Sequence, residues 1–362
     1  MDKKKHGFLK SIPLLIVEIC VLFVAIGIMV VVITMTGEVN HKEIDEEKIR
    51  INDEVVRKKT TDPEKTEVKE ETVEKESYRN IALFGVDARN GELGKGTRSD
   101  TIMIASINQN TQEIKLISVF RDTYLNLSND AYNKCNTAYA QGGPEQAINM
   151  LNMNLDLDIT DYVTIGFSGL MDAVDALGGI EIEVTEAEIS HLNNYQLCMA
   201  EELGVDYTPV ENSGRQLLNG MQATAYCRIR YTRGDDFRRA ERQREVLAAM
   251  MEKAHGASVG TLTEMVNAVL PQVETSLDAS EILGVLGSAA GYHVTASDGF
   301  PFEGGRAGAN VGSKGSCVIP VDLEENVRQL HEVLYPKESY TPSSQVQKIS
   351  EEIREQTGEY LQ

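Results

Sequence analysis

"TIMIASINQNTQEIKLISVF", from Thr101 to Phe120, decides the fold class of this chain. Two apolar runs rich in isoleucine flank the polar tetrapeptide "QNTQ", a pattern typical of two strands joined by a hairpin turn. Upstream, "YRNIALFGV" begins at Tyr78 and predicts another buried strand that ends near Gly85 or Val86. These three strands predict the beginning of a β-sheet.

Helical and strand patterns alternate after the hairpin. "GGPEQAINMLNMNL" places Pro144 at a first helical position and predicts a helix. It is followed by a predicted strand "DYVTIGF", a helix "SGLMDAVDALGG" that stops at glycines, and a strand "IEIEV". Further helices are predicted at Asp236–Ala254, Thr261–Leu270 and Leu323–Leu334. Strands interleaved with helices predict an α/β fold in which helices sandwich a mixed central β-sheet.

The amino-terminal end predicts a membrane anchor. The basic "MDKKKHGFLK" precedes 25 mostly apolar residues, Ser11–Met35, which are enough to cross a bilayer core of about 30 Å. Lysines on the amino-terminal side place that end in the cytoplasm. A cleaved signal peptide is the alternative. A signal peptide has a shorter apolar region, followed by a small-residue cleavage site that is not evident here. We expect one transmembrane helix in the cell membrane and an extracytoplasmic domain after it.

The chain therefore divides into five expected parts. These are a cytoplasmic tail (1–10), the anchor (11–36), a charged stalk (37–77), an extracytoplasmic catalytic domain (78–335) and a polar tail (336–362). The stalk has too few apolar residues to offset the entropy of ordering, although a marginal helix is an alternative. Within the domain, the glycine-rich Gly291–Ser316 is read as a surface loop rather than a mobile flap.

The five cysteines form neither a C-x-x-C pair nor a zinc-like spacing with histidine. An extracytoplasmic domain can form a disulfide, and Cys198–Cys317 is the pair to test. Buried free thiols are the favoured interpretation.

Seven arginines lie within the nineteen residues "YCRIRYTRGDDFRRAERQR", Tyr226–Arg244, of a chain with a formal net charge of −21. Alternation in "YCRIRY" predicts a strand with Arg228 and Arg230 on one face. In the helix that follows, Arg239 and Gln243 share the inward face. A buried guanidinium needs a charge partner, and a helix amino terminus adds partial positive charge. This pattern favours a phosphate pocket.

Two alternatives to that pocket remain. An internal network with Asp235, Asp236 or Glu241 would also satisfy inward arginines, whereas Arg238 and Arg244 are expected to stay in water. Nucleic-acid binding is disfavoured, because it requires a broad basic face and this chain is acidic.

Two further stretches point to the same chemistry. "GVDARNGELGKGTRSDT" puts Asp87 just after a strand and Asp100 just before one, with Arg98 between them. "VFRDTYL" puts Arg121 directly after another strand. Ligands of open α/β sheets gather at the carboxyl ends of strands. Two aspartates near several arginines are what Mg²⁺ bridging a diphosphate requires. We therefore expect a pyrophosphate site with a metal.

Four motifs in this order, "GVDAR…RSDTIMI", "SVFRDTYL", "NKCNTAYAQGG" and "YCRIRYTRGDDFRRAERQR", make the chain resemble the LytR-CpsA-Psr family of cell-envelope proteins. The resemblance implies a transferase that moves a glycopolymer, such as wall teichoic acid or capsular polysaccharide, from a polyprenyl-pyrophosphate lipid to peptidoglycan. The implied product is a phosphodiester, and the implied cofactor is Mg²⁺ or Mn²⁺. The implied setting is the cytoplasmic membrane, with no nucleic-acid partner.

The resemblance also implies residue roles. The catalytic residues would be Asp87, Asp100, Arg121 and Arg239, with Asp87 and Asp100 holding the metal and one of them acting as base. The pyrophosphate-binding residues would be Arg98, Arg121, Arg228, Arg230, Arg239 and Gln243. The supporting residues would be Asp236, Lys134 and Asn136. The third motif departs from the family, which often has histidine where Thr137 stands and an apolar residue at Cys135.

Two other functions fit the same site. One is a regulator that binds polyprenyl phosphates, and the other is a hydrolase that uses water as acceptor. In each case the lipid tail needs an apolar tunnel between sheet and helices, for which the helices after Pro144 and Asp236 and the segment "FSGLMDAV" are the candidate linings.

Overall fold

A computed structural model describes residues 40–60, 77–86, 93–230, 232, 235–278, 280–282, 284 and 291–361. The predicted anchor at 11–36 and the predicted metal ligand Asp87 lie outside these ranges. No helix within them is both long enough and apolar enough to cross a membrane.

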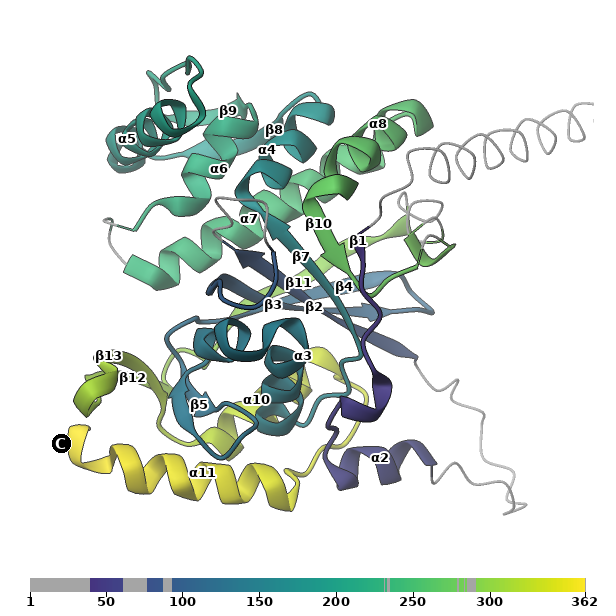
Figure 1. The fold of residues 1–362 in the computed structure, drawn as a ribbon, viewed down its shortest axis with the longest axis vertical. Helices are drawn as coiled ribbons and strands as arrows, with labels where there is room; N and C mark the ends of the chain where they lie inside the picture. Colours follow the sequence, from purple (N-terminus) through teal and green to yellow (C-terminus); the bar gives the residue numbers. More distant parts are fainter. Residues whose placement is uncertain are drawn as a thin grey trace, which may run out of the picture. The chain divides into compact units, whose positions relative to one another are not determined.

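A seven-stranded mixed sheet forms the centre of the domain, in the order β1-β10-β7-β2-β3-β4-β11 (Figure 1). Its strands are β1 (Asn40–His41), β2 (Tyr78–Val86), β3 (Ser99–Asn108), β4 (Glu113–Val119), β7 (Asp161–Gly166), β10 (Val273–Thr275) and β11 (His293–Phe300). The strands β2, β3 and β4 pair antiparallel, whereas β7 is parallel to β2 and β11 is parallel to β4. The predicted mixed sheet and the hairpin across "QNTQ" are confirmed.

Both faces of the sheet are covered by helices (Figure 1). One face packs against α3 (Asn136–Leu155) and α10 (Leu323–Leu334), which α11 (Ser344–Thr357) covers from outside, and the other face packs against α7 (Asp235–His255). In β3, Ile102 and Ile104 join the first core, while Met103 and Ala105 join the second. A strand that is buried on both faces needs apolar residues at successive positions. This requirement explains the apolar runs in the sequence of the hairpin.

A second group of elements packs beside α7 and forms a lobe. It comprises α4 (Phe167–Ala176), β8 (Ile180–Val184), α5 (Glu186–Leu203), β9 (Gly214–Leu218) and α6 (Gly220–Arg228). Val246 of α7 is buried in the same cluster, so α7 lies between the sheet and the lobe. The remaining elements are α2 (Asp53–Thr60), α8 (Val259–Val269) and the short strands β5 (Tyr124–Asn126), β6 (Tyr132–Lys134), β12 (Arg306–Asn310) and β13 (Ser316–Pro320).

The strand predicted in "YCRIRY" is wrong, because residues 220–228 form α6. Asn219 caps this helix by accepting a hydrogen bond from the backbone of Gln222, and the Gln222 side chain accepts one from the backbone of Asn219. Such a reciprocal capping box starts a helix effectively. The local alternation of arginine with isoleucine did not outweigh it.

The stalk prediction is wrong for residues 40–60, which belong to the domain. The strand β1 pairs with β10. Asn52 is buried and donates hydrogen bonds to Met153 O and to Asp156 Oδ1, at 3.1 and 2.5 Å. The polar side chains that suggested a solvated spacer thus have specific partners. Residues 61–76 of the predicted stalk lie outside the described ranges.

The carboxy-terminal segment and the glycine-rich segment are also structured. The predicted polar tail contains α11, whose Val346, Ile349 and Ile353 are at most 1% exposed and join the core. The predicted surface loop Gly291–Ser316 contains β11 and β12. A side chain at Gly299 would collide with the Phe120 ring, so this glycine permits a close approach.

The four described cysteines, Cys135, Cys198, Cys227 and Cys317, are free thiols. Because Cys198 and Cys317 are both free, the Cys198–Cys317 disulfide is not formed in this structure. Cys135, Cys227 and Cys317 are buried, as the favoured interpretation expected, whereas Cys198 is exposed.

Candidate functional site

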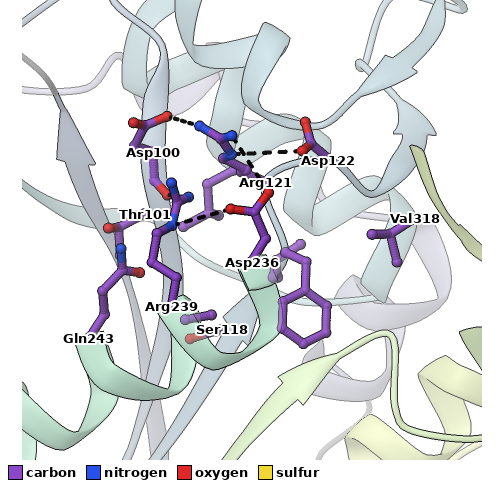
Figure 2. Close-up of a pocket in the computed structure, with 13 residues that line it drawn as sticks. Asp100, Thr101, Ser118, Arg121, Asp122, Asp236, Arg239, Gln243 and Val318 are labelled. Atoms are coloured by element: carbon purple, nitrogen blue, oxygen red, sulfur yellow. Dashed lines mark hydrogen bonds and ion pairs between the residues drawn. The ribbon is translucent and has the colours of Figure 1, made fainter. Parts of the chain in front are cut away.

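The candidate site lies at the sheet edge where β3 begins and β4 ends. In the antiparallel register Met103 pairs with Ser118, so Asp100 faces Arg121 across the two strands. Arg121 Nη1 lies 2.6 Å from Asp100 Oδ1, as Figure 2 shows. The hairpin alone therefore brings together two of the predicted catalytic residues.

The first turns of α7 form the opposite wall of this pocket. Arg239 is 4% exposed and donates from Nη2 to the backbone oxygen of Asp100 at 2.8 Å. Gln243, one turn further along the helix, lines the same pocket (Figure 2). The prediction that Arg239 and Gln243 share the inward face of a helix is confirmed.

Asp236 joins three guanidinium groups around the pocket. Its carboxylate lies 3.5 Å from Arg121 Nη2, 3.7 Å from Arg230 Nε and 3.6 Å from Arg239 Nε. Arg230 Nη2 also lies 3.5 Å from Asp100 Oδ2. We call Arg121, Arg230 and Arg239 the arginine clamp. The internal network that the sequence left open as an alternative exists, and Asp122 extends it, because Asp122 Oδ2 lies 3.8 Å from Arg121 Nε and Asp122 Oδ1 lies 3.2 Å from Lys134 Nζ. With Lys134 included, four cations face the three carboxylates of Asp100, Asp122 and Asp236, which leaves one positive charge in excess.

The electrostatics favour an anion in this pocket. Burial lowers the pKa of Arg239 to about 10, and repulsion from Arg121 contributes to the shift. Burial alone would lower the pKa of Arg121 as well, but the charges of Asp100 and Asp236 outweigh it and raise that pKa. The Nε groups of Arg121 and Arg239 are buried without a hydrogen-bond acceptor among the described residues. An incoming phosphate could satisfy both, because guanidinium and phosphate match as a two-pronged pair.

The supporting residues lie behind Arg121. Lys134 Nζ is 3.2 Å from Asp122 Oδ1, and Asp122 lines the pocket beside Arg121. Asn136 is the first residue of α3, and its backbone N–H donates to Arg121 O at 3.1 Å. Both contacts fix the segment that carries Arg121.

Three predicted binding residues are absent from the pocket wall, and of these only Arg230 is joined to it, through its ion pairs with Asp100 and Asp236. Arg228 ends α6, with its guanidinium carbon 4.7 Å from the centre of the Phe167 ring and 5.6 Å from that of Tyr195. It therefore does not share a face with Arg230, because residues 220–228 are helical. Arg98 is exposed and is not among the residues that line the pocket.

Sequence reasoning missed part of the pocket wall. Thr101, Ile102, Ser118, Val119, Phe120, Ala240 and Val318 also line it. Val318 belongs to β13, and no motif in the carboxy-terminal third signalled its position. Arg244 was expected in water but is buried, with Nε donating to Ser297 Oγ at 2.9 Å. No group of three or more His, Cys, Asp and Glu side chains within the described ranges is arranged to hold a metal ion.

Comparisons with known proteins agree with this geometry. The chain is 30% identical over 240 residues to the polyisoprenyl-teichoic acid–peptidoglycan teichoic acid transferase TagU of Oceanobacillus iheyensis, covering 64% of this chain and 69% of that protein. A solved structure described as a transcriptional regulator from Enterococcus faecalis superposes with a TM-score of 0.59 at 25% identity, covering 78% of this chain and 95% of that one.

A solved structure of TagT with bound octaprenyl pyrophosphate lipid superposes with a TM-score of 0.50 at 18% identity, over 80% of this chain and 94% of that chain, which shows the shared fold. The model of the LytR_cpsA_psr family matches residues 41–298, a range that includes every pocket residue except Val318. The chain therefore belongs to the LytR-CpsA-Psr family.

Proposed function

We propose that this chain is a membrane-anchored phosphotransferase that moves a glycopolymer from a polyprenyl-pyrophosphate carrier to peptidoglycan. The observation that carries the proposal is the convergence of Arg121, Arg230 and Arg239 on Asp236, which lines the pocket together with Arg121 and Arg239. Relatives named as teichoic acid transferases, and a fold neighbour with a bound polyprenyl pyrophosphate, support the substrate class.

The arginine clamp binds the diphosphate of the donor. Asp100 and Asp236 orient Arg239 and Arg121 before the donor enters, so the donor replaces these carboxylates as partners of guanidinium groups that are already in place. Negative charge builds on the departing lipid phosphate during transfer. Guanidinium groups that are already aimed at that charge stabilise the transition state, which is usually the largest catalytic contribution.

A divalent cation fits the donor set of this pocket. Mg²⁺ in phosphoryl-transfer sites is commonly held by one or two carboxylates together with phosphate oxygens. Asp100 is such a carboxylate, and Asp87, which follows the last residue of β2, would be the second. Mg²⁺ or Mn²⁺ would neutralise charge on the diphosphate when bound.

The reaction transfers one phosphoryl group. The acceptor hydroxyl of peptidoglycan attacks the phosphorus that carries the glycopolymer, and the bond from this phosphorus to the bridging oxygen breaks. The acceptor proton passes to Asp87 or Asp100, and the lipid leaves as a monophosphate. The product is a phosphodiester between glycopolymer and peptidoglycan.

The membrane setting is part of the proposal. Residues 11–36 would form a single-pass anchor with a cytoplasmic amino terminus, which places the pocket outside the cytoplasm where peptidoglycan lies. The lipid tail would lie in an apolar tunnel between the sheet and its helices.

A transfer assay tests the proposal. The purified full chain is incubated with a polyprenyl-pyrophosphate-linked glycopolymer, peptidoglycan and Mg²⁺, and the phosphodiester product is measured by mass spectrometry. Asp100→Asn should abolish transfer, whereas Arg215→Gln, which removes an exposed ion pair with Glu181, should not. Release of lipid monophosphate without peptidoglycan would indicate a hydrolase instead, and binding without turnover would indicate a regulator.

A further inference from the structure

Arg242 is the largest fully buried side chain among the described residues, at 1% exposure. It lies on α7, one position before Gln243 and on the side that faces the lobe. All three of its nitrogens have partners. Nε donates to Glu188 Oε1 at 2.8 Å, Nη1 to Ile229 O at 3.0 Å, and Nη2 to Thr232 Oγ1 at 2.6 Å.

Glu188, the partner of Arg242, is itself held rigidly. It is 2% exposed and occupies the third position of α5, where Oε2 accepts from the backbone N–H and the hydroxyl of Thr185, at 2.8 and 2.7 Å. Burial raises the pKa of Glu188, but the bonds from Thr185 and from Arg242 outweigh it and lower that pKa. Glu188 is therefore a fixed anion that belongs to the capping box of α5.

The two terminal nitrogens of Arg242 hold the chain on both sides of Arg230. Ile229 precedes Arg230, and Thr232 follows it by two residues. Arg230 needs such support, because its own ion pairs with Asp100 and Asp236 are long, at 3.5 and 3.7 Å, and its side chain is 35% exposed. Partly exposed ion pairs of this kind contribute little on their own.

The buried ion pair of Arg242 and Glu188 is difficult to explain by a contribution to stability alone. Removing two charges from water costs several kcal/mol, and apolar side chains of similar volume often stabilise a core equally well. What an apolar pair cannot supply is two directed hydrogen bonds to the segment that carries Arg230. The geometry of the bonds therefore distinguishes positioning from packing.

We propose that Arg242, seated on Glu188, is a positioning residue that sets Arg230 against Asp100 and Asp236 in the arginine clamp. This inference rests on the proposed function, since it assumes that the clamp binds a diphosphate. Arg242 acts through Arg230 and does not touch the ligand.

Thr232→Val gives the mildest test, because it removes the hydroxyl that Arg242 Nη2 bonds and keeps the side-chain shape. Affinity of the full chain for inorganic pyrophosphate is measured by titration calorimetry in four proteins, namely the parent, Thr232→Val, Arg230→Gln and the double variant. We expect Thr232→Val to weaken binding about 3–10-fold in the parent and to have no further effect once Arg230 is replaced. Thr232→Ser, which keeps the hydroxyl, should restore the parent affinity.

Tyr226→Phe is the matched control. It removes the hydroxyl that donates to Glu245 at 2.7 Å within the same buried network, but it keeps the backbone bond from Ile229 N–H to Tyr226 O and the bonds from Arg242 to Ile229 and Thr232. It should lower stability and leave pyrophosphate affinity unchanged. The positioning role would be overturned if Thr232→Val lowered pyrophosphate affinity equally in the parent and in Arg230→Gln. It would also be overturned if Thr232→Val left the affinity of the parent unchanged. Unchanged affinity in Arg230→Gln itself would instead refute the clamp.

Discussion

Replacing Arg239 by methionine should raise the stability of the empty protein and weaken its binding of pyrophosphate. Arg239 is buried beside two other guanidinium groups, and only Asp100 O accepts a hydrogen bond from it among the described residues. Methionine keeps most of the side-chain length without the charge. The two effects have opposite signs because the charge serves the ligand and not the fold.

The magnitude follows from the pKa of Arg239, which burial lowers from the ordinary arginine value to about 10. A cation whose pKa is lower in the folded chain destabilises the fold at every pH below about 10, and the penalty disappears only when the pH exceeds the ordinary arginine pKa. At about 1.4 kcal/mol per pKa unit the penalty is about 3 kcal/mol at neutral pH. The substitution also removes the hydrogen bond to Asp100 O, which lowers stability by about 1 kcal/mol and offsets part of this gain. A net gain of about 2 kcal/mol corresponds to a rise in Tm of roughly 4 °C.

Two measurements on the full chain check this prediction. Calorimetric melting without ligand gives the change in Tm, and titration with pyrophosphate gives the affinity. A hydrogen bond to a charged group contributes about 1.5–3 kcal/mol, so affinity should fall about 10–150-fold. Arg244→Met is the matched control, because Arg244 is also buried on α7 with its pKa lowered by burial, yet it is not among the pocket residues. Its pyrophosphate affinity should not change.

Two outcomes would refute the reasoning. A large loss of stability in Arg239→Met would mean that the ion pair with Asp236 outweighs burial and repulsion, so that Arg239 is structural. Unchanged pyrophosphate affinity would mean that the pocket does not bind diphosphate through this residue.

Three further predictions follow from the same structure. Asp100→Asn should lower the transfer rate more than about 100-fold while pyrophosphate still binds without Mg²⁺, and a transfer rate near that of the parent would exclude Asp100 as metal ligand or base. Deleting residues 343–362 should lower the free energy of unfolding by at least about 5 kcal/mol, because three apolar side chains of α11 leave the core; an unchanged urea midpoint would contradict this. At pH 8 maleimide should modify Cys198 and spare Cys135, whose pKa is raised by burial, as mass spectrometry of the labelled chain would show.

Features that depend on neighbouring residues were predictable from the sequence. The β3–β4 hairpin follows from two apolar runs around four polar residues, and its register brings Asp100 and Arg121 together without any distant contact. The shared face of Arg239 and Gln243 follows from helical periodicity. Asp236, at the start of α7, lies one turn before Arg239 and pairs with it, as helical spacing predicts.

Features that depend on distant partners were not predictable. One exception is local: Arg228 and Arg230 alternate as in a strand, but the capping box of Asn219 and Gln222, just upstream of the quoted motif, starts a helix through Arg228. Arg244 was expected in water because it does not share the inward face of Arg239 and Gln243, yet it is buried by its contact with Ser297 of β11. The burial of Arg242 depends on the lobe that covers the other side of α7, which the sequence of α7 does not indicate. The apolar stripe of α11 is three residues within a polar segment, too few to indicate burial without knowledge of α3.

The aspartates of the pocket have a consequence for the order of events in turnover. Asp100 and Asp236 already neutralise part of the arginine clamp, so any incoming anion must displace two internal counter-ions. A diphosphate carries enough charge to do so, particularly with a divalent cation. The lipid monophosphate left after transfer carries less, and the aspartates can reclaim the guanidinium groups as it departs. If the proposed transfer takes place, the same carboxylates that hold the pocket in shape would set a charge threshold that admits the donor and releases the spent carrier.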